Sequence, residues 1–217
     1  MAKSRLRVIL SAAMSIDGKI ATRTHQSKLS STKDLVRVHK LRRNVDAILI
    51  GKNTVFTDNP RLTVRYVKGK NPIRVILDSR ASVPLTSRIV RTARKIYTII
   101  VVSKKAPKKS IERLEEKGVN VIRCGQNRIN LKELLGILRK RGINKILLEG
   151  GGITNWYFLK ERLVDEIIIT ITPFVLGGKN AVSLVEGFGF DKVSKSRLFR
   201  LKKINKIKNE VLLHYVS

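Results

Sequence analysis

The sequence predicts an α/β domain built on a mostly parallel sheet that is flanked by helices. Short apolar runs of strand length alternate with stretches of helical periodicity between residues 7 and 172, and this alternation is typical of parallel β–α units. Residues 196–204 and 210–216 instead form two strand-like runs joined by a polar turn, which predicts an antiparallel pair at one edge of the sheet. No linker, internal repeat or low-complexity segment interrupts residues 1–217. We therefore expect a single domain.

The predicted strands are runs rich in Val, Ile and Leu that end near polar residues or glycine. They cover residues 7–13, 45–51, 73–78, 96–102, 119–124, 145–148 and 166–172. The predicted helices carry apolar residues at helical spacing. They cover residues 32–43, 108–117, 131–141 and 156–163, with a short helical turn at 53–56. Ser31 and Asp34 frame the start of the first helix in the manner of a capping box.

Composition restricts the class of protein before any motif is considered. With 217 residues and 42% hydrophobic content, the chain has enough material for a real core. Cys124 is the single cysteine, so no intrachain disulfide or metal site is expected, and a reducing, cytoplasmic setting is predicted. Lys3, Arg5 and Arg7 precede an apolar run that loosely resembles a signal peptide, but the run is short and favours a first buried strand. No run approaches the roughly 20 apolar residues of a membrane span.

The charge balance is strongly basic, with 46 Lys and Arg against 16 Asp and Glu and a net charge of +30. Such a chain attracts anions, either nucleic acid or phosphorylated small molecules. The basic residues are spread from Lys3 to Lys208, and aromatic residues amount to only 5%. Because stacking platforms and zinc-finger or RNP-type motifs are absent from the sequence, only the charge favours a nucleic-acid-binding protein. That class remains the alternative to an enzyme.

Residues 145–156 are the stretch that most suggests a ligand site. A short apolar run ends at Glu149, three glycines follow, and Thr154 or Asn155 is placed to cap the next helix. Glycines let a backbone approach a ligand closely, and a helix N-terminus favours a phosphate. The stretch therefore predicts either a nucleotide-phosphate cradle, with Glu149 facing the same crevice, or simply a tight turn with a helix cap.

Other candidate residues follow the predicted strands. In an open α/β sheet, ligands bind beyond the carboxyl ends of the strands. The segments at these ends are residues 13–17, 51–58, 78–80, 103–105 and 149–154. The hydroxyl of Ser79 and the guanidinium of Arg80 suit the 2′-phosphate of a phosphorylated dinucleotide, although a solvated turn is the alternative. No G-x-G-x-x-G fingerprint opens the chain, so a dinucleotide fold other than the Rossmann fold is indicated.

Four motifs together resemble one family. They are Met14-Ser15-Ile16-Asp17-Gly18-Lys19-Ile20-Ala21, the segment 51–65 with Asp58-Asn59-Pro60-Arg61-Leu62 at its centre, Leu77-Asp78-Ser79, and Glu149-Gly150-Gly151-Gly152. Their order and spacing are similar, over nearly the whole chain, to those of the riboflavin-biosynthesis reductases. That resemblance implies a dihydrofolate-reductase-like fold and a homodimer.

The resemblance also implies a reaction and a set of site residues. The reaction is the NADPH-dependent reduction of a ribosylaminopyrimidine 5′-phosphate, with hydride delivered to C1′ of the opened ribose. The residues implied at the cofactor are Ala13, Thr54, Asp58, Ser79, Gly151, Gly152, Ile153 and Thr154, to which Arg80 is added from its position. The residues implied at the substrate are Ser30, Arg42, Leu62, Arg65 and Glu149, with Glu149 as the candidate catalytic residue.

The chemistry of these side chains agrees with their implied roles. Arg42 and Arg65 offer forked donors for a phosphate, although both could be ordinary surface arginines. A buried Glu149 needs hydrogen-bond donors from a ribose or amine, or else is a paired core carboxylate. Asp17 is expected only to shape its Asp-Gly turn.

Two departures from the bacterial relatives suggest which substrate is reduced. Bacterial relatives often carry a lysine where Ser11 stands and a tryptophan near Lys28, so the sequence looks closer to the archaeal and fungal branch. That branch reduces the 2,5-diaminopyrimidinone before deamination, and the deaminated aminouracil is the alternative substrate. A true dihydrofolate reductase is disfavoured because a pterin needs no 5′-phosphate site.

Overall fold

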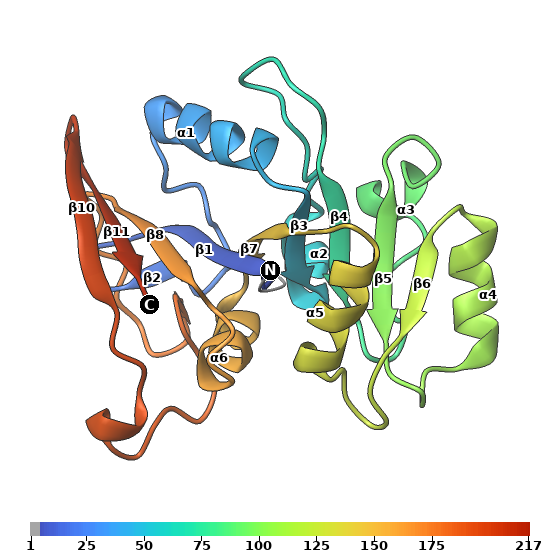
Figure 1. Ribbon diagram of the computed structural model, residues 1–217. Helices are drawn as coiled ribbons and strands as arrows, with labels where there is room; N and C mark the ends of the chain where they lie inside the picture. Colours follow the sequence, from blue (N-terminus) through green and yellow to red (C-terminus); the bar gives the residue numbers. More distant parts are fainter. Residues whose placement is uncertain (1–4) are drawn as a thin grey trace.

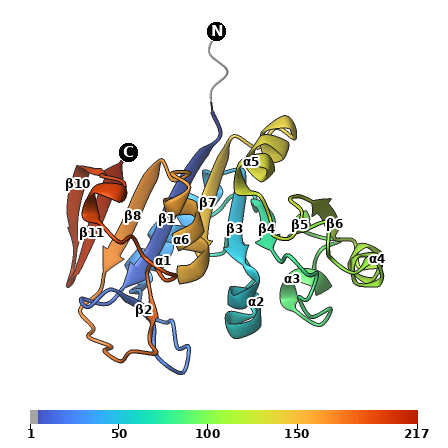
Figure 2. The ribbon, with the colours of Figure 1, turned by 90° about the horizontal axis from the view of Figure 1, so that it is seen from below.

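The computed structural model describes residues 5–217, so Lys3 lies outside the described residues. Its centre is a nine-stranded sheet with the order β10-β11-β8-β1-β7-β3-β4-β5-β6, and Figure 2 shows these strands side by side. Seven strands run parallel, namely β1 (Arg7–Met14), β3 (Ala47–Gly51), β4 (Ile73–Leu77), β5 (Thr98–Val102), β6 (Asn120–Arg123), β7 (Lys145–Gly150) and β8 (Glu166–Ile171). β10 (Arg200–Ile207) and β11 (Glu210–Val216) form the antiparallel edge. The predicted fold class is confirmed, and residues 7–13 form a buried strand as expected.

Helices cover both faces of the sheet, as Figure 1 shows for α1 on one side and α5 and α6 on the other. They are α1 (Thr32–Arg43), α2 (Lys52–Asp58), α3 (Arg88–Arg91), α4 (Lys108–Glu116), α5 (Leu131–Lys140) and α6 (Gly152–Lys160). Successive residues of a strand point to opposite faces, so Leu49 packs in the core with α5 and α6, whereas Ile48 and Ile50 pack in the core with α2, α3 and α4. Because both faces are covered, the central strands read as continuous apolar runs.

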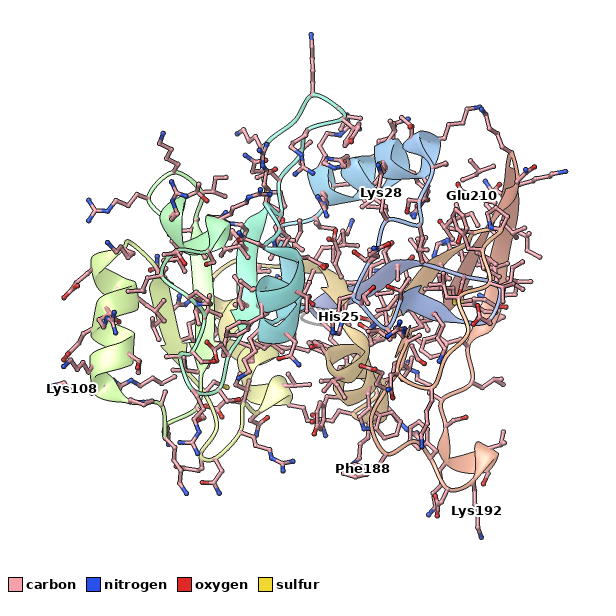
Figure 3. The ribbon with its side chains drawn as sticks, turned by 180° about the vertical axis from the view of Figure 1, so that it is seen from behind. His25, Lys28, Lys108, Phe188, Lys192 and Glu210 are labelled. Carbon is pink, nitrogen blue, oxygen red and sulfur yellow. The ribbon has the colours of Figure 1, made fainter. Side chains whose placement is uncertain are left out.

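The start of α1 is held by a carboxylate from the far end of the chain. The Ser31 hydroxyl accepts a hydrogen bond from the Asp34 amide at 3.2 Å, as the capping box predicts. Asp34, however, is buried against Arg37 and Thr170. The reciprocal bond comes instead from Glu210 on the hairpin, which accepts from the Ser31 amide at 2.7 Å and is labelled in Figure 3.

The predicted start of α6 is wrong. The helix begins at Gly152 and ends at Lys160, and its N-cap, Gly151, offers no side-chain bond. Thr154 and Asn155 therefore lie inside the first turn, where the Asn155 side-chain amide donates to the Leu184 carbonyl at 2.8 Å. Tertiary contacts, and not a polar cap, decide where this helix begins.

A second, two-stranded sheet was not predicted. β2 (Lys19–Ala21) pairs with β9 (Val182–Ser183), and both strands are too short to show a period. The neighbouring Asp17 carboxylate accepts from the amides of Leu176 and Gly177 at 3.0 and 2.8 Å. Asp17 thus joins its turn to a distant loop, beyond shaping the turn itself. The other differences are α3, the 3₁₀ turn Val193–Lys195, and the start of β10 at Arg200 in place of Ser196.

No helix within residues 5–217 is long and apolar enough to cross a membrane.

Candidate functional site

A cleft of about 1400 Å³ opens at the carboxyl ends of the parallel strands. Every site residue predicted from the sequence lines it, apart from Leu62 and Arg65. These lining residues are Ala13, Ser30, Arg42, Thr54, Asp58, Ser79, Arg80, Glu149, Gly151, Gly152, Ile153 and Thr154. They come from segments up to 141 positions apart in the sequence, and the strand order of the sheet brings them together.

A second pocket of about 260 Å³ adjoins the cleft. It is lined by Arg42, Pro60, Arg61, Leu62, Arg65 and Arg88. Arg42 lines both cavities. Four arginine residues around so small a volume suit an anion with several oxygens, such as a phosphate.

Arg42 and Glu149 form a two-point ion pair between the two cavities. Arg42 Nε and Nη2 each donate to one carboxylate oxygen of Glu149 at 2.7 Å, and Nη1 donates to the Thr63 carbonyl at 3.1 Å. Both side chains are only 13% exposed. Burial acts to lower the pKa of Arg42, but the charge and hydrogen bonds of Glu149 outweigh it, so the pKa is raised. Glu149 is therefore a carboxylate paired with a helix residue.

The loop between α2 and β4 carries the other arginines. Asn59 and Leu62 have left-handed backbone angles, with φ of 40° and 50°. Leu62 is buried in the core, so it contributes one wall of the small pocket while its side chain anchors the loop. Arg65 is exposed, and its Nη1 donates to the Thr63 hydroxyl at 2.8 Å. Burial, together with the nearby charges of Arg42 and Arg61, lowers the pKa of Arg65.

The three glycines at the junction of β7 and α6 each lie against a different part of the protein. A Cβ added to Gly150 would lie 2.0 Å from Asn155 Oδ1, and one added to Gly152 would lie 2.5 Å from the Ser183 carbonyl. Gly151 has a φ of 92° and faces the Thr54 hydroxyl, which itself donates to the Gly150 carbonyl at 3.1 Å. The turn is thus required by the packing of the protein, and it also leaves bare backbone along the cleft.

The turn after β4 is shaped by a buried aspartate. The Asp78 carboxylate accepts from the amides of Ser82 and Val83, the latter at 2.7 Å. Ser79 and Arg80 are thereby held at the cleft, where Arg80 Nη1 donates to the Lys105 carbonyl at 3.3 Å.

Several cleft residues were missed by the sequence interpretation. The segment 125–133 follows β6 and lines the cleft, and the rule of strand ends could have identified it. The segment 20–27 has His25 near the middle of the molecule in Figure 3. Ile20 and Ala21 belong to the motif 14–21, but β2 is too short to predict that the segment lies at a strand end. Arg88 of the small pocket was also missed; its amide donates to Asn59 Oδ1 at 2.7 Å.

Asp58 is another acid that lines the cleft. Burial raises its pKa, although a hydrogen bond from Thr57 and the charge of His25 oppose the shift. Within residues 5–217, no group of three or more His, Cys, Asp and Glu side chains is arranged to hold a metal ion.

Comparison with known proteins assigns this arrangement to a family. The sequence model of the RibD C-terminal domain matches residues 7–213. The chain belongs to the RibD C-terminal domain family. Two similar members, from Methanothermobacter thermautotrophicus and Aquifex aeolicus, are named 2,5-diamino-6-ribosylamino-4(3H)-pyrimidinone 5′-phosphate reductase. The first is 41% identical over 96% of both chains, and the second is 40% identical over 90% of this chain and 89% of the relative.

Solved structures of the RibD family share the fold. Acinetobacter baumannii RibD superimposes with a TM-score of 0.85 at 26% identity, covering 100% of this chain and 59% of that longer chain. A dihydrofolate reductase from Enterococcus faecalis superimposes with a TM-score of 0.56 at 12% identity, covering 97% of this chain and 95% of the other. The fold is therefore dihydrofolate-reductase-like, as predicted.

Proposed function

We propose that this RibD-family domain is an NADPH-dependent reductase of 2,5-diamino-6-ribosylamino-4(3H)-pyrimidinone 5′-phosphate. Relatives that are 40% and 41% identical over most of their length carry that name. The observation that carries the proposal is the arginine-lined pocket, which shares Arg42 with a cleft large enough for a dinucleotide and a pyrimidine. The product is the ribitylamino compound.

The substrate phosphate binds in the small pocket. Arg42 already uses Nε and Nη2 on Glu149, so Arg61, Arg65 and Arg88 supply most of the free donors. Guanidinium forks bind phosphate oxygens in pairs. Burial, followed by the charges of Arg42 and Arg61, lowers the pKa of Arg65, so positive charge is gathered there. A dianion in this pocket relieves the repulsion among these arginines.

The cofactor binds along the rest of the cleft. Two features of the cleft fit a dinucleotide. The backbone at Gly151 is bare, and α6 begins without a side-chain cap, so its first amide groups are available to a diphosphate. Ser79 and Arg80, with Lys104 beside them in the cleft, suit a 2′-phosphate. When bound, NADPH supplies the hydride; the protein supplies position and electrostatics.

Glu149 acts on the reacting part of the substrate. Each of its oxygens accepts one bond from Arg42 and keeps a lone pair for a ribose hydroxyl or an exocyclic amine. Its negative charge also stabilises the positive charge that builds up when the opened ribose forms an imine at C1′. Ser30 and Ala13 also line the cleft.

The protein functions as a homodimer in a reducing, cytoplasmic setting. Strand β10 is an open edge of the sheet, and the segment before it exposes Phe188, Val193 and Leu198 by 99%, 91% and 91%. Figure 3 shows Phe188 pointing away from the body of the molecule. Exposed large apolar side chains beside an open sheet edge suit contact with a second copy of the chain. Cys124 is buried as a free thiol.

The test is an absorbance assay at the nicotinamide band. We expect NADPH oxidation with the ribosylaminopyrimidinone phosphate, and a lower rate with the deaminated aminouracil phosphate. Faster turnover of the aminouracil would reassign the substrate, and turnover of dihydrofolate alone would overturn the proposal.

A further inference from the structure

A buried histidine on α1 contacts the backbone of the arginine loop. His39 is 2% exposed and lies one helical turn before Arg42. Its Nδ1 accepts a hydrogen bond from the Arg65 amide at 2.8 Å, and the Tyr66 amide lies 3.5 Å from the same atom. The His39 and Tyr66 rings meet edge to face, with centroids 4.8 Å apart.

We propose that His39 is a positioning residue that sets the place of Arg65 for the substrate phosphate. This inference rests on the proposed function, because it gives His39 a role in the phosphate pocket. His39 touches neither cavity itself, since it lines neither the cleft nor the small pocket. It acts through the Arg65 backbone.

The geometry requires a neutral imidazole at His39. A ring nitrogen that accepts an amide hydrogen carries no proton, so the ring proton is on Nε2. Burial, followed by the charges of Arg42 and Arg65, lowers the pKa of His39 to about 4, and the charge of Glu149 only partly opposes this. The positive charges that bind the phosphate therefore also keep His39 in its accepting form.

α1 thus holds residues 63–66 of the loop at two points. Arg42 donates to the Thr63 carbonyl at 3.1 Å, and His39 accepts from the Arg65 amide at 2.8 Å. One contact satisfies a backbone acceptor and the other a backbone donor. Arg42 also lines the small pocket. Helix α1 therefore carries Arg42 and, through His39, also fixes the position of Arg65 relative to it.

Three substitutions at His39 separate this role from simple packing. His39→Asn places an amide oxygen where Nδ1 stands, His39→Gln moves the acceptor one bond further, and His39→Phe keeps a ring against Tyr66 without any acceptor. We expect His39→Phe to raise the KM for the phosphorylated substrate about tenfold or more, as for a lost hydrogen bond to a buried acceptor. The kcat should stay within about twofold, and His39→Asn should restore the KM to within about threefold.

The same variants are compared on a dephosphorylated substrate and on NADPH alone, where we expect no change. An unchanged KM for the phosphorylated substrate in His39→Phe overturns the proposal. An equal loss on all substrates, without rescue by His39→Asn, also overturns it and leaves His39 as a packing residue.

A readout independent of activity distinguishes this inference from the proposed function. Hydrogen exchange of the Arg65 amide, followed by NMR, should be slow in the wild type and in His39→Asn and faster in His39→Gln. Inorganic phosphate should bind more weakly to His39→Gln than to His39→Asn. If neither pyrimidine is reduced, the proposed function fails, yet exchange and phosphate binding still decide the role of His39. If His39→Gln and His39→Asn have equal exchange rates at the Arg65 amide and equal affinities for phosphate, the positioning role of His39 is overturned.

Discussion

Arg42 on α1 and Glu149 at the end of β7 are 107 residues apart and form a fork-to-fork ion pair with two contacts of 2.7 Å. The pair spans the boundary between the cleft and the arginine-lined pocket. Each residue was a separate candidate for the substrate site. Together they form one unit, in which Arg42 is half committed to Glu149 and the Glu149 carboxylate is already paired before any ligand binds.

Because of this ion pair, we expect substitutions at Arg42 and Glu149 to affect the stability of the fold and the reductase activity differently. Glu149→Leu or Arg42→Met alone leaves a largely buried partner unsatisfied and should lower the free energy of unfolding by about 3 kcal/mol. Arg42→Met combined with Glu149→Leu removes both charges and should be more stable than either single variant, yet inactive. Urea denaturation and the reductase assay measure the two properties. Additive losses of stability in the double variant contradict the prediction.

Arg65 should be specific for the phosphate. Arg65→Ala is expected to lower kcat/KM for the phosphorylated substrate by at least about 30-fold, because a dianion loses a forked donor worth roughly 2–4 kcal/mol. Cofactor affinity and turnover of a dephosphorylated analogue should barely change. Arg43→Ala is the matched control, since Arg43 is exposed and lines neither pocket. If the analogue loses as much activity, Arg65 is structural and Arg61 and Arg88 are tested next.

The choice of NADPH over NADH should depend on the turn after β4. The double variant with Ser79→Ala and Arg80→Ala is expected to reduce the ratio of NADPH affinity to NADH affinity at least about tenfold, because a charge-assisted contact contributes about 1.5–3 kcal/mol. Titration of both cofactors by fluorescence gives the ratio, and Arg91→Ala serves as a control from an exposed site outside the cleft. An unchanged ratio assigns the 2′-phosphate to Lys104 or Lys105.

Substitutions of Gly151 and Gly152, the last two glycines of the turn, should have different effects. Gly151→Val is expected to abolish cofactor binding in a folded protein, since the side chain would enter the cleft at a φ that branched residues avoid. Gly152→Val should also destabilise the fold, because its Cβ would meet the Ser183 carbonyl. Cofactor titration and thermal unfolding of the two variants test this. Normal cofactor binding in Gly151→Val would exclude the cradle.

His39 should make the protein less stable in mild acid. Its folded pKa is lowered to about 4 from 6.5, so between these pH values the unfolded chain takes up a proton that the folded chain does not. The contribution of His39 to the free energy of unfolding is therefore complete above about pH 6.5. It decreases by at most about 1.4 kcal/mol per pH unit as the pH falls toward 4.

The groups facing His39 are Arg42, Arg65, Tyr66 and Glu149. The measurement is the free energy of unfolding of the wild type minus that of His39→Asn at each pH, which cancels the contributions of other groups, including Asp58 with its raised pKa. A difference that does not vary with pH contradicts the prediction.

The sequence alone determined where most strands and helices lie and which residues gather at the strand ends. Apolar periodicity is a local property, so β1, β3 and β7, and helices such as α1 and α5, could be located within a few residues. The strand-end rule likewise selected Thr54, Ser79 and Gly151 for the cleft.

The tertiary structure decided which side chains meet. Partners such as Arg42 with Glu149, or Ser31 with Glu210, are separated by 107 and 179 positions, and neither residue type nor spacing specifies such a pair. The start of α6 at Gly152 and the pairing of β2 with β9 depend on the same kind of distant contact. These features follow from the strand order of the sheet, because the energy of an ion pair or a cap depends on geometry that only the folded chain provides.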